Sequence, residues 1–214
     1  MVMSSRVWGG TTLDVRRESR REKLLEVGFE LLGGPDGASA VTVRSVCRHA
    51  KLTDRYFYES FADRDELLVA VYDQVGAEAR DVLAEAVAEA VGATPDPERV
   101  ARAAVEAFFG LLTADPRKGR VLLLAPMTDT VLNVRALGLM PMFGELIRVQ
   151  LAAANGSPEP AELEQRLTAS ALIGALSNLF VRWLDGTLEV SEHDLTEYCV
   201  RLLVHAVPLA GHTP

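Results

Sequence analysis

The sequence predicts an all-α protein, with a small N-terminal helical domain followed by a larger helical C-terminal domain. Apolar residues recur at spacings of three and four along nearly the whole chain, which is the helical period. No segment combines strand-length alternation with a hairpin turn. Strings rich in Gly and Pro, such as G-G-P-D-G at 33–37 and G-A-T-P-D-P at 92–97, separate the periodic segments and predict where helices end.

Composition excludes several classes of protein. The chain has 214 residues, of which 49% are hydrophobic and 24% charged, so a disordered chain is excluded. The longest unbroken apolar run, 121–127, is too short to cross a bilayer, and the N-terminus shows no signal peptide. The two cysteines provide neither a disulfide framework nor zinc-ligand spacing. We expect a soluble cytoplasmic protein without membrane, metal or cofactor.

One longer helix and two short helices are predicted near the N-terminus. Residues 1–13 are expected to form a flexible arm, and a helix is predicted over 14–32, where glycines and a proline then stop it. A helix over 43–50 follows, with Thr42 as its N-cap. The next covers 54–60 and is expected to be capped by Thr53.

A long helix begins the second part of the chain. Asp63 and Glu66 have the spacing of a capping box and predict a helix over 64–91. We therefore divide the chain into a domain over 14–62 and a domain over 63–214. Further helices are predicted in the second domain at 98–113, 117–124, 128–153, 161–185 and 192–206.

The two short helices form the motif that carries function. Helices of about seven residues are unstable alone, so the helix over 14–32 must pack against them. Their three-residue connection predicts a helix-turn-helix, whose second helix enters the major groove of DNA. Arg55 near the start of that helix can donate to guanine O6 and N7. Phe57 and Phe61 are expected in the core.

Hydroxyl and basic side chains around this motif suit phosphate oxygens. Thr42, Thr53 and Tyr58 carry hydroxyls, and Arg64 in the first turn of the next helix could grip the DNA backbone from another side. The overall net charge of −8 opposes DNA binding, but residues 1–60 carry +2 and the remainder −10. The basic residues alternate with glutamates over 16–23, which fits a solvated helix face as well as a DNA-binding stripe.

The stretch T-V-R-S-V-C-R-H-A-K-L-T-D-R-Y-F-Y-E-S-F-A-D-R-D-E-L-L at 42–68 resembles the DNA-binding signature of TetR-type transcriptional repressors. The aromatic positions of that signature are matched by Phe57, Tyr58 and Phe61, and Arg64 with Asp65 replaces its Lys-acid pair. The resemblance implies a homodimer whose first three helices bind DNA, while the other helices bind a ligand and dimerise. It places seven residues at DNA-facing positions: Thr42, Arg44, Thr53, Arg55, Tyr56, Tyr58 and Arg64.

Two departures from the family pattern affect the expected docking on DNA. Lys51 stands where the family usually has glycine in the turn, and a left-handed backbone there would cost about 1 kcal/mol. Its positive charge near phosphate could offset that cost, so we include Lys51 among the DNA-binding residues. Ser60 replaces the usual His or Tyr, which shortens or removes one contact to the DNA backbone.

The C-terminal helices contain apolar stripes that fit either an ordinary core or an interface. The resemblance implies that the last two long helices form a four-helix bundle with a second copy. The interface candidates are Leu167, Ile173, Leu176, Phe180, Leu195, Tyr198 and Leu202.

The middle helices are rich in large apolar side chains. Core is the ordinary interpretation of such residues, and the resemblance adds a pocket for a small hydrophobic effector. Pro141 lies inside a helical pattern and is expected to kink it, which can leave a cavity alongside. The pocket candidates are Phe108, Phe109, Leu112, Leu123, Met127, Met140, Phe143 and Trp183.

Together these patterns predict a sequence-specific transcriptional regulator, namely a repressor that a small hydrophobic effector releases from a palindromic operator. Its predicted partners are double-stranded operator DNA, the effector and a second copy of the chain. A helical interaction or small-molecule-binding protein that no longer binds DNA is the alternative, and an activator or a nucleoid-type binder fits the same motif. An enzyme is not expected, because G-x-S-x-G, P-loop and H-E-x-x-H motifs are absent from the sequence.

Overall fold

The computed structural model describes residues 13–93, 96–155 and 161–206. Helices joined by short connections make up these ranges, and no strand occurs in them, so the all-α prediction is confirmed for this part of the chain. The predicted arm at 1–13 lies outside the described residues, except for Leu13 at the start of the first helix.

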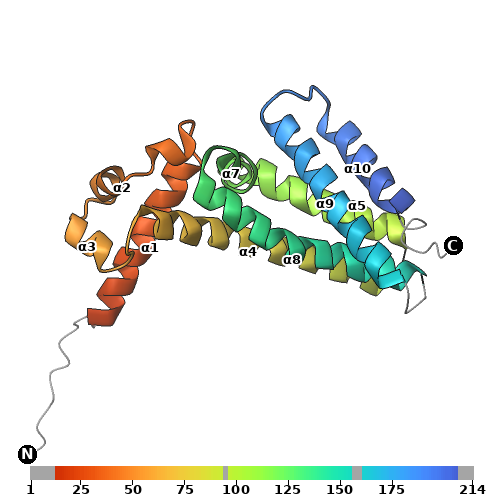
Figure 1. Ribbon diagram of the computed structural model, residues 1–214, viewed down its shortest axis with the longest axis horizontal. Helices are drawn as coiled ribbons and strands as arrows, with labels where there is room; N and C mark the ends of the chain where they lie inside the picture. Colours follow the sequence, from red (N-terminus) through yellow and green to blue (C-terminus); the bar gives the residue numbers. More distant parts are fainter. Residues whose placement is uncertain (1–12, 94–95, 156–160, 207–214) are drawn as a thin grey trace, which may run out of the picture.

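Three helices and a 3-10 turn form a head at one end of the molecule (Figure 1). They are α1 (Leu13–Leu32), η1 (Gly37–Ala40), α2 (Val43–Ala50) and α3 (Asp54–Tyr58). The predicted core positions Phe57 and Phe61 are 0% and 1% exposed, packed with buried Leu24 of α1 and Val46 of α2. The helix ends agree with the sequence prediction, except that α3 ends at Tyr58 and not at residue 60.

The long helix α4 (Arg64–Ala93) runs from the head into the body (Figure 1). The Asp63 carboxylate accepts the Glu66 N–H at 2.9 Å, as predicted for the start of this helix. The Glu66 carboxylate accepts the N–H of Ala62 instead of the N–H of Asp63. A Cβ on Gly28 of α1 would lie 3.0 Å from Val71 Cγ2, so this glycine lets α1 and α4 approach closely.

Among the described residues, the body consists of six α-helices and one π-turn, in addition to α4. They are α5 (Pro97–Ala114), α6 (Pro116–Gly119), η2 (Arg120–Leu124), α7 (Ala125–Thr128), α8 (Thr130–Asn155), α9 (Ala161–Leu184) and α10 (Glu192–Ala206). The helix predicted over 117–124 is divided into α6 and the π-turn η2. Pro126 has no N–H for the carbonyl of Leu122 four residues earlier, and the Tyr72 hydroxyl of α4 donates to that carbonyl at 3.3 Å.

Two helices of the body are long and apolar enough to span a bilayer by length and composition, over Thr130–Val149 of α8 and Leu163–Leu184 of α9. The longest unbroken apolar run, 121–127, lies in neither of these helices, because polar residues and glycines interrupt their apolar stretches. Only 6% and 22% of these windows are buried within the chain. α8 and α9 pack against each other, and both contribute to a cavity, so much of their apolar surface is available to a ligand or to another molecule.

Candidate DNA-binding surface and effector cavity

The turn between α2 and α3 is built by local hydrogen bonds. At the start of α2, the Thr42 hydroxyl accepts the Ser45 N–H at 3.0 Å, and the Ser45 hydroxyl accepts the Thr42 N–H at 2.9 Å, so the predicted cap is present. At the end of α2, Leu52 N–H donates to Cys47 O at 2.9 Å and Lys51 N–H to Arg48 O at 3.3 Å. These two bonds form a Schellman motif.

Lys51 adopts the left-handed conformation that this motif requires. Its φ is 56° and its ψ is 39°, and it is the non-glycine residue with positive φ in the described part of the chain. The predicted backbone strain is therefore present. The side chain is exposed beside the start of α3, where its ammonium group adds to the charge of this surface.

α3 presents its polar residues outward and one aromatic residue inward. The Arg55 side chain is 84% exposed and Tyr58 is 59% exposed, whereas Phe57 between them is fully buried. Thr53 has the backbone conformation of an N-cap, but its hydroxyl makes no capping hydrogen bond, so that part of the prediction is wrong. The exposed Thr53 hydroxyl is thereby open to a ligand from solvent. Arg44 of α2 is also exposed.

Arginines of α1 hold the C-terminal end of α3. Arg17 donates to the carbonyl of Glu59 at 2.7 Å, and Arg21 donates to the carbonyl of Ser60 at 2.7 Å. Cations at a helix C-terminus are favoured by the helix dipole and by the free carbonyls. Arg17 and Arg21 are therefore engaged in contacts within the protein. Both sequence-based alternatives for 16–23, a solvated face and a DNA-binding stripe, left such contacts out.

Arg20 of α1 covers the predicted DNA-facing residue Tyr56. The guanidinium carbon lies 4.4 Å from the centre of the Tyr56 ring, and the ring is half-buried. Arg20 also lies 3.6 Å from the Glu59 carboxylate, which accepts Arg55 Nε at 3.0 Å. Tyr56 is thus less accessible than Tyr58. Glu59 and the exposed Asp54 at the start of α3 are the acidic residues of this helix region.

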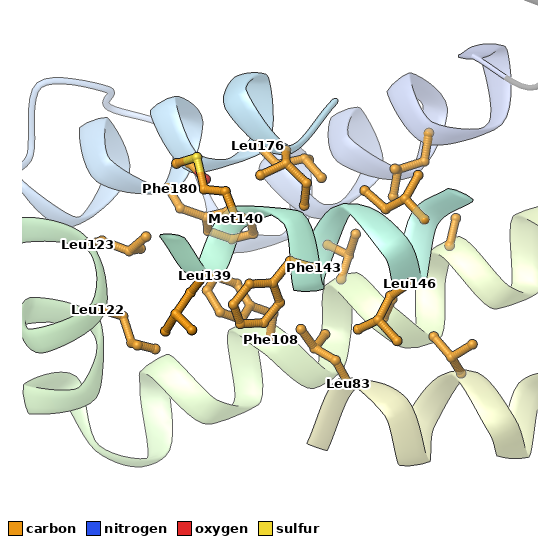
Figure 2. Close-up of a pocket in the computed structure, with 18 of the residues that line it drawn as sticks. Leu83, Phe108, Leu122, Leu123, Leu139, Met140, Phe143, Leu146, Leu176 and Phe180 are labelled. Carbon is orange, nitrogen blue, oxygen red and sulfur yellow. The ribbon is translucent and has the colours of Figure 1, made fainter. Parts of the chain in front are cut away.

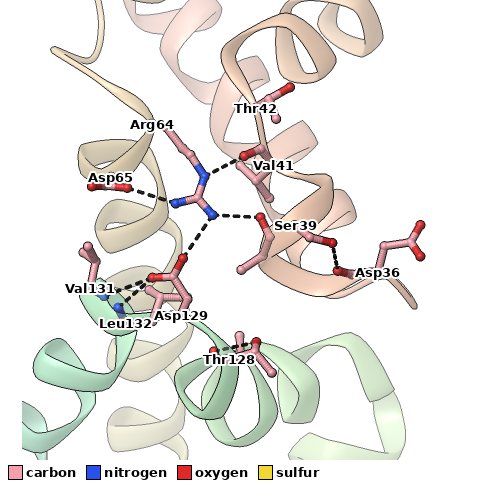
Figure 3. Close-up of polar contacts among 12 residues, drawn as sticks. Asp36, Ser39, Val41, Thr42, Arg64, Asp65, Thr128, Asp129, Val131 and Leu132 are labelled. Atoms are coloured by element: carbon pink, nitrogen blue, oxygen red, sulfur yellow. Dashed lines mark hydrogen bonds and ion pairs between the residues drawn. The ribbon is translucent and has the colours of Figure 1, made fainter.

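The structure corrects the expected role of Arg64. Its Nε donates to Val41 O at 2.7 Å, and its Nη2 donates to Ala38 O at 2.8 Å and to the Asp129 carboxylate at 3.0 Å (Figure 3). Its Nη1 donates to Asp65 at 3.0 Å. Because each guanidinium nitrogen already has an intramolecular acceptor, Arg64 joins the head to the body and is not a free phosphate contact.

An apolar cavity of about 460 Å³ lies in the body, between α4, α5, α8, α9 and α10 (Figure 2). Five of the eight predicted residues line it: Phe108, Leu123, Met127, Met140 and Phe143. Phe109, Leu112 and Trp183 do not. Phe109 and Leu112 are each 1% exposed in a neighbouring core, where the Phe109 ring lies 5.1 Å from the Trp183 ring. A one-residue step around α5 separates Phe108, which faces the cavity, from Phe109, which faces this core.

The predicted interface residues do not share one outward face. Ile173, Leu176 and Phe180 line the cavity, and Leu195 is 3% exposed. Leu202 is half-buried, while Leu167 of α9 and Tyr198 of α10 are 62% and 50% exposed. The outward face of α9 instead combines Leu163 and Leu167 with a run of small or polar residues, namely Ser170, Ala171, Gly174, Ala175 and Asn178.

Sequence reasoning missed several cavity residues. Leu83 and Val87 come from α4, Leu146 and Ile147 from the second half of α8, and Ser177 from α9. The four apolar residues lie on apolar helical stripes, which is the same signal that core residues produce, and the polar Ser177 gives no such signal. Only the relative placement of the helices distinguishes the two cases.

Both cysteine thiols are buried and ionise less readily than a free thiol. Burial raises the pKa of Cys199 to about 11, and burial together with the nearby Asp54 raises the pKa of Cys47 to about 11. Both are buried and form no disulfide. Across the residues that the structure describes, no cluster of potential metal ligands occurs.

No protein-family model matches the sequence. An HTH-type transcriptional regulator of Haemophilus influenzae is 31% identical over 72 residues, which cover 34% of this chain and 35% of that protein. The match thus spans about a third of that relative's length. A TetR-like transcriptional regulator from Rhodococcus sp. RHA1 superposes with a TM-score of 0.63 at 18% identity, over 88% of this chain and 96% of that chain. This chain has the TetR-like fold.

A second solved structure with the TetR-like fold is FadR from Bacillus subtilis in complex with stearoyl-CoA. It superposes with a TM-score of 0.70 at 15% identity, over 86% of this chain and 98% of that chain. The fold of this chain contains two separate candidate binding sites. One is the exposed polar face of α2 and α3, and the other is the apolar cavity in the body.

Proposed function

We propose that this chain is a sequence-specific DNA-binding transcriptional regulator of the TetR type, and that it acts as a repressor. The observation that carries the proposal is the arrangement of α3, in which Arg55 and Tyr58 are exposed while Phe57 anchors the helix in the core. A rigid short helix with outward polar side chains fits the major groove. The TetR-like fold and the HTH-type relative support it.

In this proposal Arg55 reads base edges and the surrounding residues hold phosphates. A guanidinium can donate two hydrogen bonds to guanine O6 and N7. Exposed hydroxyl and basic groups around α3 position the head on the duplex without reading sequence. They are Thr42, Arg44, Lys51, Thr53 and Tyr58. Tyr56 has a smaller part because Arg20 covers its ring.

We assign DNA binding to residues 14–62, and effector binding and dimerisation to residues 63–214. A homodimer would place two copies of α3 on two half-sites of a palindrome. The outward face of α9, with exposed Leu167 among small residues, is the interface that we propose in place of the apolar set named from sequence. Small residues let helices approach closely and so increase contact area. The cavity holds a small hydrophobic effector, and the protein acts in the cytoplasm without cofactor or catalytic residue.

Selection of bound fragments from genomic DNA tests this function. We expect a palindromic site, bound with a steep salt dependence between 50 and 200 mM despite the acidic composition, because phosphate neutralisation is local. Arg55→Ala should weaken binding to that site by at least about tenfold, which corresponds to about 1.4 kcal/mol. Arg99→Ala, at an exposed arginine of α5, is the matched control and should bind normally.

The dimer is measured in the same preparations by light scattering. If Arg55→Ala and the wild type are both dimeric and bind DNA with equal affinity, the assignment of α3 as the helix that contacts base edges is contradicted. Failure to select any fragment would favour the alternative of a small-molecule-binding protein that does not bind DNA.

A further inference from the structure

The cavity wall is almost free of charge. Among its described lining residues Asp96 is the one charged group, and no lysine, arginine or histidine lines it. Asp96 is exposed at the start of α5, where its carboxylate accepts the Glu98 N–H at 3.3 Å.

Two arginines on the cavity helices, Arg102 and Arg135, are already paired with carboxylates. Arg102 of α5 donates to Glu197 and lies 3.3 Å from Glu98, and these bonds raise its pKa above the ordinary range. Arg135 of α8 donates to both carboxylate oxygens of Asp73, at 2.5 and 2.8 Å. These guanidinium groups would have to leave their partners before they could neutralise an anionic ligand.

Apart from Asp96, the polar side chains of the described wall are neutral. The Ser177 hydroxyl of α9 and the Asn133 amide of α8 line the cavity, and no hydrogen bond to another described residue involves either side chain. Tyr72 also lines it, but its hydroxyl donates to Leu122 O at 3.3 Å. Burial raises the pKa of Tyr72 to about 12, so the phenol is uncharged at physiological pH.

Burial of an unpaired carboxylate or phosphate in such surroundings is strongly unfavourable, because the group loses its hydration and gains no cation. A hydroxyl, carbonyl or ether group loses far less, and it can exchange hydrogen bonds with Ser177 or Asn133. A cavity of about 460 Å³ lies within the usual range for small-molecule sites.

We propose that the cavity binds an uncharged, largely hydrocarbon molecule with a hydroxyl, carbonyl or ether head, and that it discriminates against the carboxylate or coenzyme A thioester of the same chain. This inference rests on the effector site of the proposed function and specifies its ligand class. It separates this chain from the Bacillus subtilis neighbour of the same fold, whose structure holds stearoyl-CoA.

Four ligands with one alkyl chain and different heads test the proposal by isothermal titration with the full-length protein. They are dodecanol, used below its solubility limit, and dodecanoate, dodecyltrimethylammonium and dodecanoyl-CoA, each used below its micellar concentration. We expect dodecanol to bind at least about 100-fold more tightly than dodecanoate or dodecanoyl-CoA. Equal or tighter binding of either anion would overturn the proposal. Tightest binding of the cation would overturn it in favour of Asp96 as a head-group site, and absence of binding by all four would also overturn it.

A charge added to the wall provides a second readout. Ser177→Lys should increase dodecanoate affinity at least about tenfold, because the new ammonium neutralises the carboxylate. Ser177→Met, of similar length and without charge, is the control and should leave dodecanoate weak. Thermal unfolding shows that both variants are folded. If Ser177→Lys is unfolded, Asn133→Lys at the exposed part of the wall takes its place, with Asn133→Met as control.

The DNA-binding assay keeps this proposal separate from the proposed function. A protein that selects a palindromic site but does not bind dodecanol would contradict only the ligand class. A protein that binds dodecanol but selects no DNA would contradict the regulator proposal and leave the ligand class standing.

Discussion

The guanidinium of Arg64, at the start of α4, and the carboxylate of Asp129, between α7 and α8, form an ion pair with an Nη2–Oδ2 distance of 3.0 Å. The same carboxylate accepts the N–H groups of Val131 and Leu132 at 3.0 and 3.2 Å, so Asp129 also caps α8 (Figure 3). Arg64 in turn holds the carbonyls of Ala38 and Val41 in the head. One side-chain contact therefore links the cavity helix α8 with the base of α2.

Asp129→Asn should weaken this link while it preserves the helix cap, because asparagine is also a good N-cap. We expect stability to fall by about 1 kcal/mol, and the effect of a cavity ligand on DNA affinity to decrease. Urea unfolding and DNA titrations with and without ligand measure the two effects.

Asp65→Asn is the matched control for the same guanidinium. Asp65 also accepts from Arg64 at 3.0 Å, but its side chain is 51% exposed against 11% for Asp129. It should change neither property measurably, because exposed ion pairs contribute little. If the ligand changes DNA affinity equally in both variants and in the wild type, the Arg64–Asp129 ion pair stabilises the contact between head and body but does not transmit the effect of the ligand.

Glu59→Gln should strengthen DNA binding. The carboxylate holds Arg55 Nε at 3.0 Å and repels phosphate, whereas glutamine removes the charge and keeps the backbone carbonyl that accepts from Arg17. We expect a few-fold gain in affinity at 50 mM salt, and a smaller gain at 200 mM because of screening. Fluorescence anisotropy with the selected site measures it, and Glu89→Gln on α4 is the control. Weaker binding of Glu59→Gln would show that Glu59 mainly positions Arg55.

Lys51→Gly should raise stability and lower DNA affinity. Glycine removes the strain at φ 56°, which we expect to be worth about 0.5–1 kcal/mol after the entropy of a more flexible unfolded chain is subtracted. Loss of one phosphate contact should reduce the salt slope of DNA binding by about one. Lys51→Arg retains both the strain and the charge, so it should resemble the wild type in thermal unfolding and in DNA titrations. An unchanged salt slope in Lys51→Gly would remove Lys51 from the DNA-binding surface.

Stability should fall as the pH rises from about 9 to about 11. The pKa of Cys199 is raised from 9.0 to about 11 by burial, so the unfolded thiol loses its proton first and alkaline pH favours the unfolded state. Each such group contributes a slope of at most about 1.4 kcal/mol per pH unit. Urea unfolding at several pH values measures the slope, which Cys199→Ala should reduce whatever its effect on stability at pH 7. If Cys199→Ala shows the same slope as the wild type, ionisation of Cys199 does not cause the pH dependence of stability.

The local sequence determined the helices and the turn of the head. Thr42 and Asp63 supply side-chain acceptors at fixed offsets, the glycines after α1 stop that helix, and the aromatic residues of α3 separate into buried Phe57 and exposed Tyr58 by helical period. These interactions join residues within four positions of one another, so a pattern along the chain is sufficient to predict them.

Only the tertiary structure decided which distant groups meet. The partners of Arg64 include Asp129, 65 positions away, and the hydroxyl of Tyr72 meets the carbonyl of Leu122. Likewise Phe108 and Phe109 are adjacent and chemically identical, but one faces the cavity and the other the core. The rotation and crossing of packed helices set these outcomes, and an apolar stripe has the same period whether it faces a core, a ligand or a second copy.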